Sequence, residues 1–233
     1  MDRSEIDRAC VNSEAADKML REVSAPFLVK TNEQYEVAKP RVVVVGQETN
    51  GWLGLYKEFL DRNTIIDALS TYESFDFGRM YNSTFFQYFD RIRNSIFGAN
   101  ATKDSRKVIL WLNLFKFFHG SMIRSPHLEA VLNLQADVFQ QELKLLKPDV
   151  VIFLTGPNYD CIIRRFYPNV LPKPLEVYSE RQVAQLVHRD LPSLTFRTYH
   201  PGYLNRFKKK TEHCLPAILK RVLDAIQGQR RYL

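Results

Sequence analysis

Four short runs of apolar, largely β-branched or aromatic residues stand out along the chain. They cover residues 41–45, 107–115, 149–155 and 194–199. Continuous apolar runs of this length are typical of strands that are buried on both faces, as the strands of a parallel sheet are. The pattern therefore predicts a central, mostly parallel four-stranded sheet.

Segments with apolar residues at helical spacing separate these runs. The expected helices cover residues 3–22, 82–97, 127–146, 158–166 and 215–227. Ser125 and Pro126 favour a start for the third helix, and Gly228 favours an end for the last one. Because strands and helices alternate, we expect right-handed crossovers and a three-layer α/β/α sandwich.

The chain has 233 residues, and no repeat or Pro/Gly-rich linker divides it. We expect a single domain over residues 1–233, with residues 1–40 as an N-terminal helical extension. No apolar run is long enough to span a membrane, and the first ten residues are too polar for a secretory signal. Three cysteines are too few and too widely spaced for a disulfide framework or a zinc or iron–sulfur signature. We therefore expect a cytoplasmic protein without a metal. We also expect it to be a monomer.

Charge gives the first indication of a partner. The chain holds 33 Lys or Arg against 26 Asp or Glu, a net charge of +7. Residues 201–233 carry eight of the basic residues and only two of the acidic ones. A local basic face of this kind suits the phosphate backbone of a nucleic acid such as DNA, although a soluble basic protein with a charged tail would look the same.

Ligands of open parallel sheets bind beyond the carboxyl ends of the strands, so the residues that follow each apolar run are candidates for a site. The first run continues into Gly46 and Gln47, followed by a carboxylate at Glu48 and an amide at Asn50. The second run contains Asn113, whose amide would cost a few kcal/mol if it were buried without a partner. Asn113 must therefore either cap a backbone group or contact a ligand.

The fourth run ends at His200 and leads into a loop that combines apolar and basic residues. The candidates for DNA binding in this loop are Pro201, Gly202, Tyr203, Leu204, Arg206, Lys208, Lys209 and Lys210. An exposed leucine beside cations would suit a protein that opens stacked bases while it holds phosphates. We expect Leu204 to be that wedge.

At these positions the chain resembles the uracil-DNA glycosylase superfamily. The family's first motif, Gly-Gln-Asp-Pro-Tyr-His, is similar to the segment that begins at Gly46, with Glu48 in place of the aspartate. The family's base-reading asparagine, which lies in an apolar Leu-Leu-Asn setting, is similar to Asn113. Its final motif, His-Pro-Ser-Pro-Leu, is similar to the segment that begins at His200. The match covers roughly residues 41–206.

The resemblance implies a uracil-DNA glycosylase-like fold and a reaction without a cofactor, the hydrolysis of the N-glycosidic bond of a damaged base in DNA. By similarity, Glu48 would orient the attacking water and stabilise the positive charge that develops on the sugar. His200 would donate to O2 of the base as negative charge develops there, and Asn113 would pair with N3–H and O4. Leu204 would fill the gap that the flipped base leaves.

The chain departs from the family pattern in the first loop. Asn50 stands where strict uracil enzymes have a tyrosine that excludes the thymine methyl group, so we expect a pocket that is open to 5-substituted uracils or to hypoxanthine. Gly46 and Gln47 complete the substrate-binding set of this loop. The family also stacks a phenylalanine on the flipped base, and Phe75 and Phe77 are the candidates for that role.

Two other functions stay open. The altered loop is compatible with a superfamily member that binds nucleic acids or nucleotides without base release. Fold-level reasoning alone is compatible with an unrelated α/β enzyme that acts on a small anionic ligand.

Overall fold

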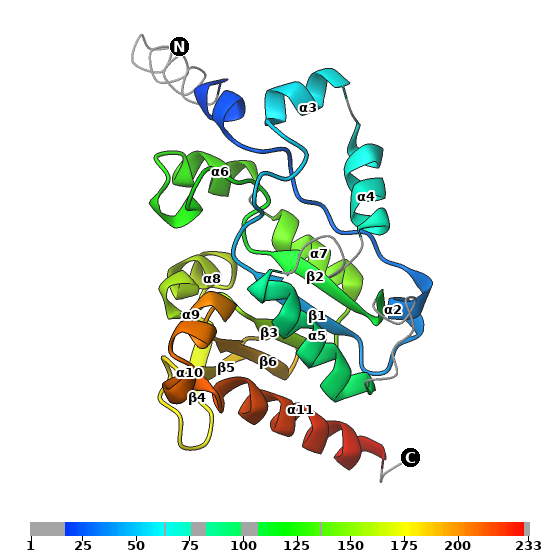
Figure 1. The fold of residues 1–233 in the computed structure, drawn as a ribbon, viewed down its shortest axis with the longest axis vertical. Helices are drawn as coiled ribbons and strands as arrows, with labels where there is room; N and C mark the ends of the chain where they lie inside the picture. The colour runs from blue at the N-terminus through cyan, green and yellow to red at the C-terminus, as the bar shows by residue number, and fades with distance from the viewer. Residues whose placement is uncertain (1–16, 63, 76–82, 99–106, 136, 231–233) are drawn as a thin grey trace.

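The computed structural model describes residues 17–62, 64–75, 83–98, 107–135 and 137–230. Its centre is a six-stranded sheet with the order β2-β1-β3-β6-β5-β4 (Figure 1). The strands are β1 (Val42–Gly46), β2 (Ile109–Asn113), β3 (Val150–Phe153), β4 (Leu171–Pro174), β5 (Val183–Val187) and β6 (Leu194–Thr198).

The four apolar runs form the parallel part of the sheet, β2-β1-β3-β6, as predicted. The predicted number of strands was wrong, because β5 pairs antiparallel with β6 and β4 pairs antiparallel with β5. The sequence of β4, LPKP, contains two prolines and is largely exposed. Proline within sheets is confined to edge positions such as this one. Because β4 is an exposed edge strand, its sequence lacks the continuous apolar pattern by which buried strands are predicted.

Helices cover both faces of the sheet. Trp111 of β2 lies in register with Val44 of β1, which in turn pairs with Ile152 of β3, so these three side chains share one face. On that face, Trp111 packs against Phe86 of α5 (Thr84–Phe97), with ring centroids 5.1 Å apart. Phe153, one residue beyond Ile152, points to the other face and contacts α7 (Val138–Leu146). The architecture is thus α/β with helices on either side of the sheet.

Two predicted helix boundaries were wrong. The helix expected over residues 127–146 is split into α6 (Leu128–Leu134) and α7. Between them, the buried side chain of Gln135 accepts a hydrogen bond from the Lys116 backbone and donates one to the Leu114 carbonyl, which ties the break to the end of β2. The last helix, α11 (Cys214–Arg230), continues through Gly228 instead of ending there, because a glycine lowers helix stability but does not forbid a helix.

The N-terminal segment is part of the core rather than a helical extension. Within its described part, residues 17–22 are helical, residues 23–32 are not, and α2 (Glu33–Val37) follows. Val23 and Phe27 are fully buried. The Phe27 N–H donates to the Lys116 carbonyl at 2.7 Å, so this segment lies beside the chain that leaves β2.

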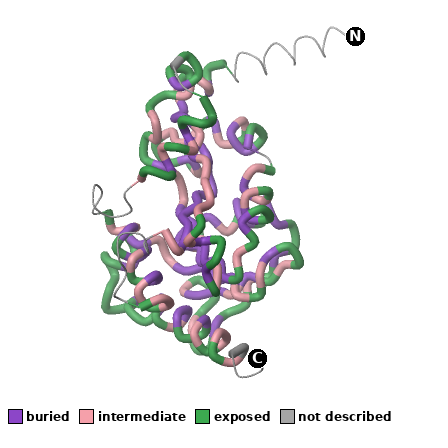
Figure 2. Tube along the Cα trace, turned by 90° about the vertical axis from the view of Figure 1, so that its right-hand side faces the viewer, coloured by how far each residue is buried: buried purple, intermediate pink, exposed green. Residues whose placement is uncertain are grey.

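The remaining elements are mostly short and connect the layers. They are α3 (Tyr56–Arg62), α4 (Ile65–Ser74), η2 (Met122–Arg124), η3 (Pro157–Tyr159), α8 (Asp160–Phe166), α9 (Pro201–Arg206) and α10 (Lys208–Thr211). Figure 2 shows the buried stretches concentrated in the interior of the molecule and the exposed ones on its outer surface. No helix in the described part of the chain combines the length and the apolar character that crossing a membrane requires.

Candidate functional site

A cavity of about 530 Å³ opens at the carboxyl ends of β1 and β2, where the sequence predicted a site. Seven of the predicted residues line it: Gly46, Gln47, Glu48, Asn50, Phe75, Asn113 and His200. They come from the ends of β1, β2, α4 and β6, which are far apart in the sequence. The fold therefore brings the carboxylate, the amide and the imidazole to one cavity. Phe77 lies outside the described residues.

Asn113 ends β2 directly beside Gly46 of β1. Its side chain is buried, and its Oδ1 accepts a hydrogen bond from the Trp111 indole N–H at 2.9 Å. A Cβ on residue 46 would come within 2.4 Å of this Oδ1 atom. Glycine is thus required at residue 46 if the Asn113 amide is to keep its position.

Three buried polar atoms of residues that line the cavity have no hydrogen-bond partner among the described residues. They are Nδ2 of Asn113, Oγ1 of Thr49 and Nε1 of Trp52. A buried donor without a partner costs about 1–3 kcal/mol, and such groups are rare in native structures. All three belong to residues of one cavity, which suits a polar ligand. Sequence reasoning missed Thr49 and Trp52, since neither stands out from the loop that contains them.

The Glu48 carboxylate is held by two donors. The Tyr159 hydroxyl donates to its Oε2 at 2.9 Å, and the backbone of Met122 provides a second hydrogen bond. Burial raises the pKa of Glu48, whereas both hydrogen bonds oppose that rise. The carboxylate is therefore fixed in place and more basic than an exposed glutamate. Sequence reasoning treated the turn that contains Tyr159 as structural and missed this contact.

The His200 imidazole has a defined tautomer. Its Nδ1 accepts a hydrogen bond from the Gly202 backbone N–H at 3.1 Å. Burial lowers the pKa of His200, so the neutral ring is favoured, and its single proton must then lie on Nε2. His200 thus offers an N–H donor, and its side chain also lines a neighbouring hollow of about 240 Å³ that includes Tyr159 and Tyr203.

Aromatic rings form much of the remaining wall. The half-buried ring of Phe75 lies 5.7 Å from that of Trp52 and 5.8 Å from that of Trp111, measured between centroids. The ring of Phe85 also lies 5.7 Å from that of Trp111. A cavity with such walls and a few fixed polar groups suits a flat heteroaromatic ligand.

The expectation that Leu204 is an exposed wedge was wrong. Leu204 is only 2% exposed, because α9 turns it toward the core. Tyr203 and Phe207, four residues apart, share the outer side and are 43% and 41% exposed. Their rings lie 4.5 Å apart, and Tyr203 also stacks on Tyr199 at 4.4 Å.

The other residues predicted to bind DNA lie around this aromatic row. Those that are exposed are Gly202, Arg206, Lys208, Lys209 and Lys210, whereas Pro201 is buried. The row begins at Tyr199 and Tyr203, which line the smaller hollow beside His200, and continues to Phe207, which lies among the four exposed cations in the sequence. We call this surface the aromatic–basic surface.

No family model matches the chain, and no curated protein matches it either.

Proposed function

We propose that the chain is a DNA base-excision glycosylase, a divergent member of the uracil-DNA glycosylase superfamily, that hydrolyses the N-glycosidic bond of uracil or a related damaged base. The observation that carries this proposal is that Glu48, Asn113 and His200 line one cavity of about 530 Å³ at the strand ends. An enzyme that acts on a base needs such a pocket, because the target nucleotide must leave the base stack before the bond can be reached.

The base would be recognised by an amide and by an aromatic face. The unpartnered Nδ2 of Asn113 is a donor that suits the O4 carbonyl of uracil. Oδ1 accepts from Trp111 but keeps a second lone pair for the N3–H donor of the base. The Phe75 ring, which lines the same cavity, would stack on the base.

The leaving group would be stabilised by His200. As the bond between N1 of the base and C1′ of the sugar breaks, its electron pair departs with the base and negative charge develops on O2. The Nε2–H of a neutral His200, already oriented by the Gly202 contact, would donate to that oxygen. A preorganised donor of this kind contributes on the order of 10²–10³ in rate.

The nucleophile would be water oriented by Glu48. The sugar becomes oxocarbenium-like as the base leaves, and a nearby carboxylate stabilises this positive charge. Water then adds to C1′ and passes a proton to Glu48. Burial raises the pKa of this carboxyl, which favours that transfer.

DNA would lie across the aromatic–basic surface. Exposed aromatic rings stack on bases and exposed cations contact phosphates, which is the usual combination for single-stranded or flipped nucleotides. Tyr203 replaces the buried Leu204 as the residue that would fill the gap in the stack.

The test uses labelled oligonucleotides that carry uracil, 5-hydroxymethyluracil, a thymine–guanine mismatch or hypoxanthine, in single- and double-stranded form. Alkali cleaves the abasic sites that base release creates. We expect cleavage by the wild type and a loss of about 100-fold or more in His200→Ala. His213→Ala, at an exposed histidine outside the cavity, is the matched control. DNA binding without cleavage on any substrate would support a nucleic-acid-binding module instead.

A further inference from the structure

Two histidines and a glutamate converge outside the cavity. The carboxylate of Glu22 and the imidazoles of His119 and His127 each present a donor atom, and these three atoms lie within 4.8 Å of one another. Glu22 Oε2 lies 2.6 Å from Nε2 of His127 and 3.8 Å from Nε2 of His119. An ion pair needs only one histidine, whereas two imidazoles that approach one carboxylate oxygen are the donor set of a transition-metal site.

The three donors come from separate parts of the chain that the fold ties together. Glu22 ends the helical segment 17–22, His119 follows β2, and His127 precedes α6. Ser24 links the first two parts, since its N–H donates to the Phe118 carbonyl at 2.9 Å and its hydroxyl accepts from the Phe118 N–H at 3.0 Å. Tertiary hydrogen bonds close to Glu22 and His119 therefore hold these two side chains near each other.

A supporting contact orients the His119 ring. The Ser125 hydroxyl lies 3.2 Å from Nδ1 of His119 and accepts a hydrogen bond from the His127 backbone N–H at 3.1 Å. If Nδ1 of His119 carries the proton and donates to Ser125, Nε2 keeps its lone pair and faces Glu22. Ligating histidines in proteins are commonly oriented by such a second hydrogen bond.

We propose that Glu22, His119 and His127 bind one Zn²⁺ ion. Imidazole nitrogens and carboxylate oxygens are both common zinc ligands, and tetrahedral bonds of about 2.0–2.1 Å place ligand atoms roughly 3.3 Å apart. The observed separations of 2.6 and 3.8 Å bracket that value. The side chains of Glu22 and His119 are partly exposed, so a fourth position is open to water.

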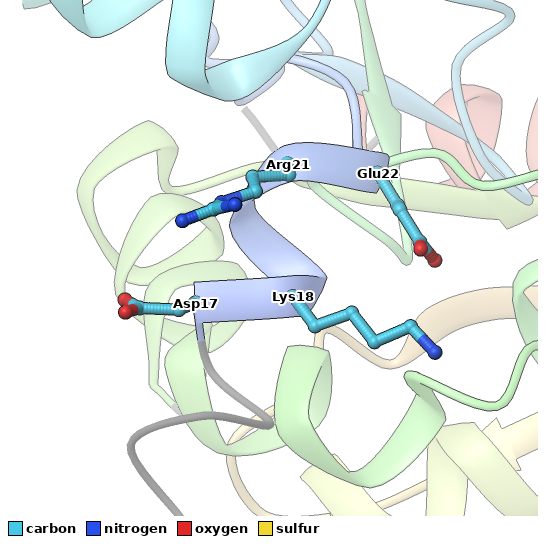
Figure 3. A pocket seen from close by; sticks show the side chains of 4 residues that line it. All are labelled: Asp17, Lys18, Arg21 and Glu22. Carbon is cyan, nitrogen blue, oxygen red and sulfur yellow. The ribbon is translucent and has the colours of Figure 1, made fainter.

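Solvent reaches Glu22 through a surface hollow of about 400 Å³ that Asp17, Lys18 and Arg21 also line (Figure 3). Figure 3 shows Lys18 and Glu22 on the same side of the helical segment. The Lys18 ammonium attracts the Glu22 carboxylate and therefore competes with a cation for it. Lys18→Ala should accordingly tighten zinc binding.

The proposed ion would stabilise residues 119–127, the segment whose backbone contacts Glu48. Between the two histidines lie Ser121, which hydrogen-bonds to Tyr159, and Met122, whose backbone hydrogen-bonds to Glu48. A metal that joins His119 to His127 would thus stabilise this segment at both ends. The expectation of no metal was based on cysteine alone, and this cluster contains none.

The experiment titrates chelator-treated full-length protein with Zn²⁺ by calorimetry and with Co²⁺ by visible absorption, without DNA. The wild type should bind one equivalent of Zn²⁺, give a Co²⁺ d–d band, and unfold at a higher temperature with zinc. His119→Ala and Glu22→Gln, both at partly exposed side chains, should each lose the band and bind zinc on the order of 100-fold more weakly.

His213→Ala is the control, because His213 lies 3.3 Å from Glu212 in an exposed histidine–glutamate pair. It should leave zinc binding unchanged. Failure of the wild type to bind zinc at micromolar concentration, or equal binding by the wild type, His119→Ala and Glu22→Gln, would overturn the proposal. Far-UV circular dichroism of each variant checks that it is folded. Zinc binding is measured without DNA, so its failure is distinguishable from the failure of base release.

Discussion

Gly46 and Asn113 face each other across β1 and β2, so close that a methyl group on residue 46 would come within 2.4 Å of the Asn113 side-chain oxygen. The asparagine amide is thus positioned by the absence of a side chain on the neighbouring strand. Its oxygen is held by the Trp111 indole, while its Nδ2 has no partner among the described residues. The pair therefore fixes the unpartnered donor of a residue that lines the cavity.

Gly46→Ala should displace the Asn113 amide and slow base release. A displacement of about 1 Å at a recognising group can cost on the order of 100-fold in rate. Gly228→Ala is the matched control, because nothing lies within 4 Å of a Cβ there. Single-turnover base release of the three proteins measures the effect. Equal rates in Gly46→Ala and the wild type would mean that the amide position does not matter.

Tyr159→Phe should move the pH dependence of base release. The Tyr159 hydrogen bond lowers the pKa of Glu48, which burial raises, so its removal should raise that pKa further. The carboxylate form is then lost at a higher pH, and the rate should begin to fall at a higher pH than in the wild type as the solution is acidified. Rate profiles measure the shift.

Tyr178→Phe removes another hydroxyl, one that donates to the exposed His213 carbonyl, and serves as the control for the pH profile. Its profile should coincide with that of the wild type. A shift to lower pH in Tyr159→Phe would contradict the assignment of Glu48 as the group that must be ionised.

Leu204→Ala should mainly lower the stability of the fold, whereas Tyr203→Ala should mainly weaken DNA binding. Truncation of the buried Leu204 should lower the free energy of unfolding by about 2–5 kcal/mol without a specific loss of DNA affinity. Truncation of the exposed Tyr203 should leave stability within about 1 kcal/mol of the wild type and weaken DNA binding on the order of tenfold. Urea unfolding and fluorescence anisotropy measure the two quantities.

Leu145→Ala is the control, because it truncates a leucine that is 78% exposed and therefore creates no cavity in the core. A Leu204→Ala protein with unchanged stability and weakened DNA binding would restore Leu204 as the wedge.

Asp160→Asn should destabilise the fold through Arg197. The fully buried Arg197 guanidinium donates to both oxygens of Asp160, at 3.0 and 2.9 Å. Neutralising Asp160 leaves a buried cation without its counter-ion, which costs about 3–5 kcal/mol. The exposed pair of Arg165 and Glu129 gives the control, since Glu129→Gln should cost less than about 1 kcal/mol. Equal free energies of unfolding in the two variants would contradict this account.

The parallel sheet and the location of the cavity could be predicted because each depends on a local pattern. Three of the four parallel strands are almost wholly apolar, whereas β6 also carries the buried Arg197, and polar residues such as Glu48 and His200 follow soon after the strands end. Parallel strands place their carboxyl ends at one edge, so residues that are far apart in the sequence meet there.

The rest depends on contacts that no local pattern records. The burial of Leu204 is set by which side of α9 packs on the core, and a six-residue helix gives too little periodicity to show it. The antiparallel strand β4 carries prolines and little apolar character. Tyr159 meets Glu48 from 111 residues away, and the Glu22 cluster joins segments that only the tertiary fold brings together.

The most direct measurement of the central claim is single-turnover release of uracil from a single-stranded oligonucleotide by the wild type, Asn113→Ala and His200→Ala. Both residues line the cavity. In the proposed mechanism, Asn113 would donate to the base and His200 to the charge that develops on it. The account predicts that the wild type creates abasic sites and that each variant does so on the order of 100-fold more slowly, with the fold retained. Unchanged rates in both variants would contradict it.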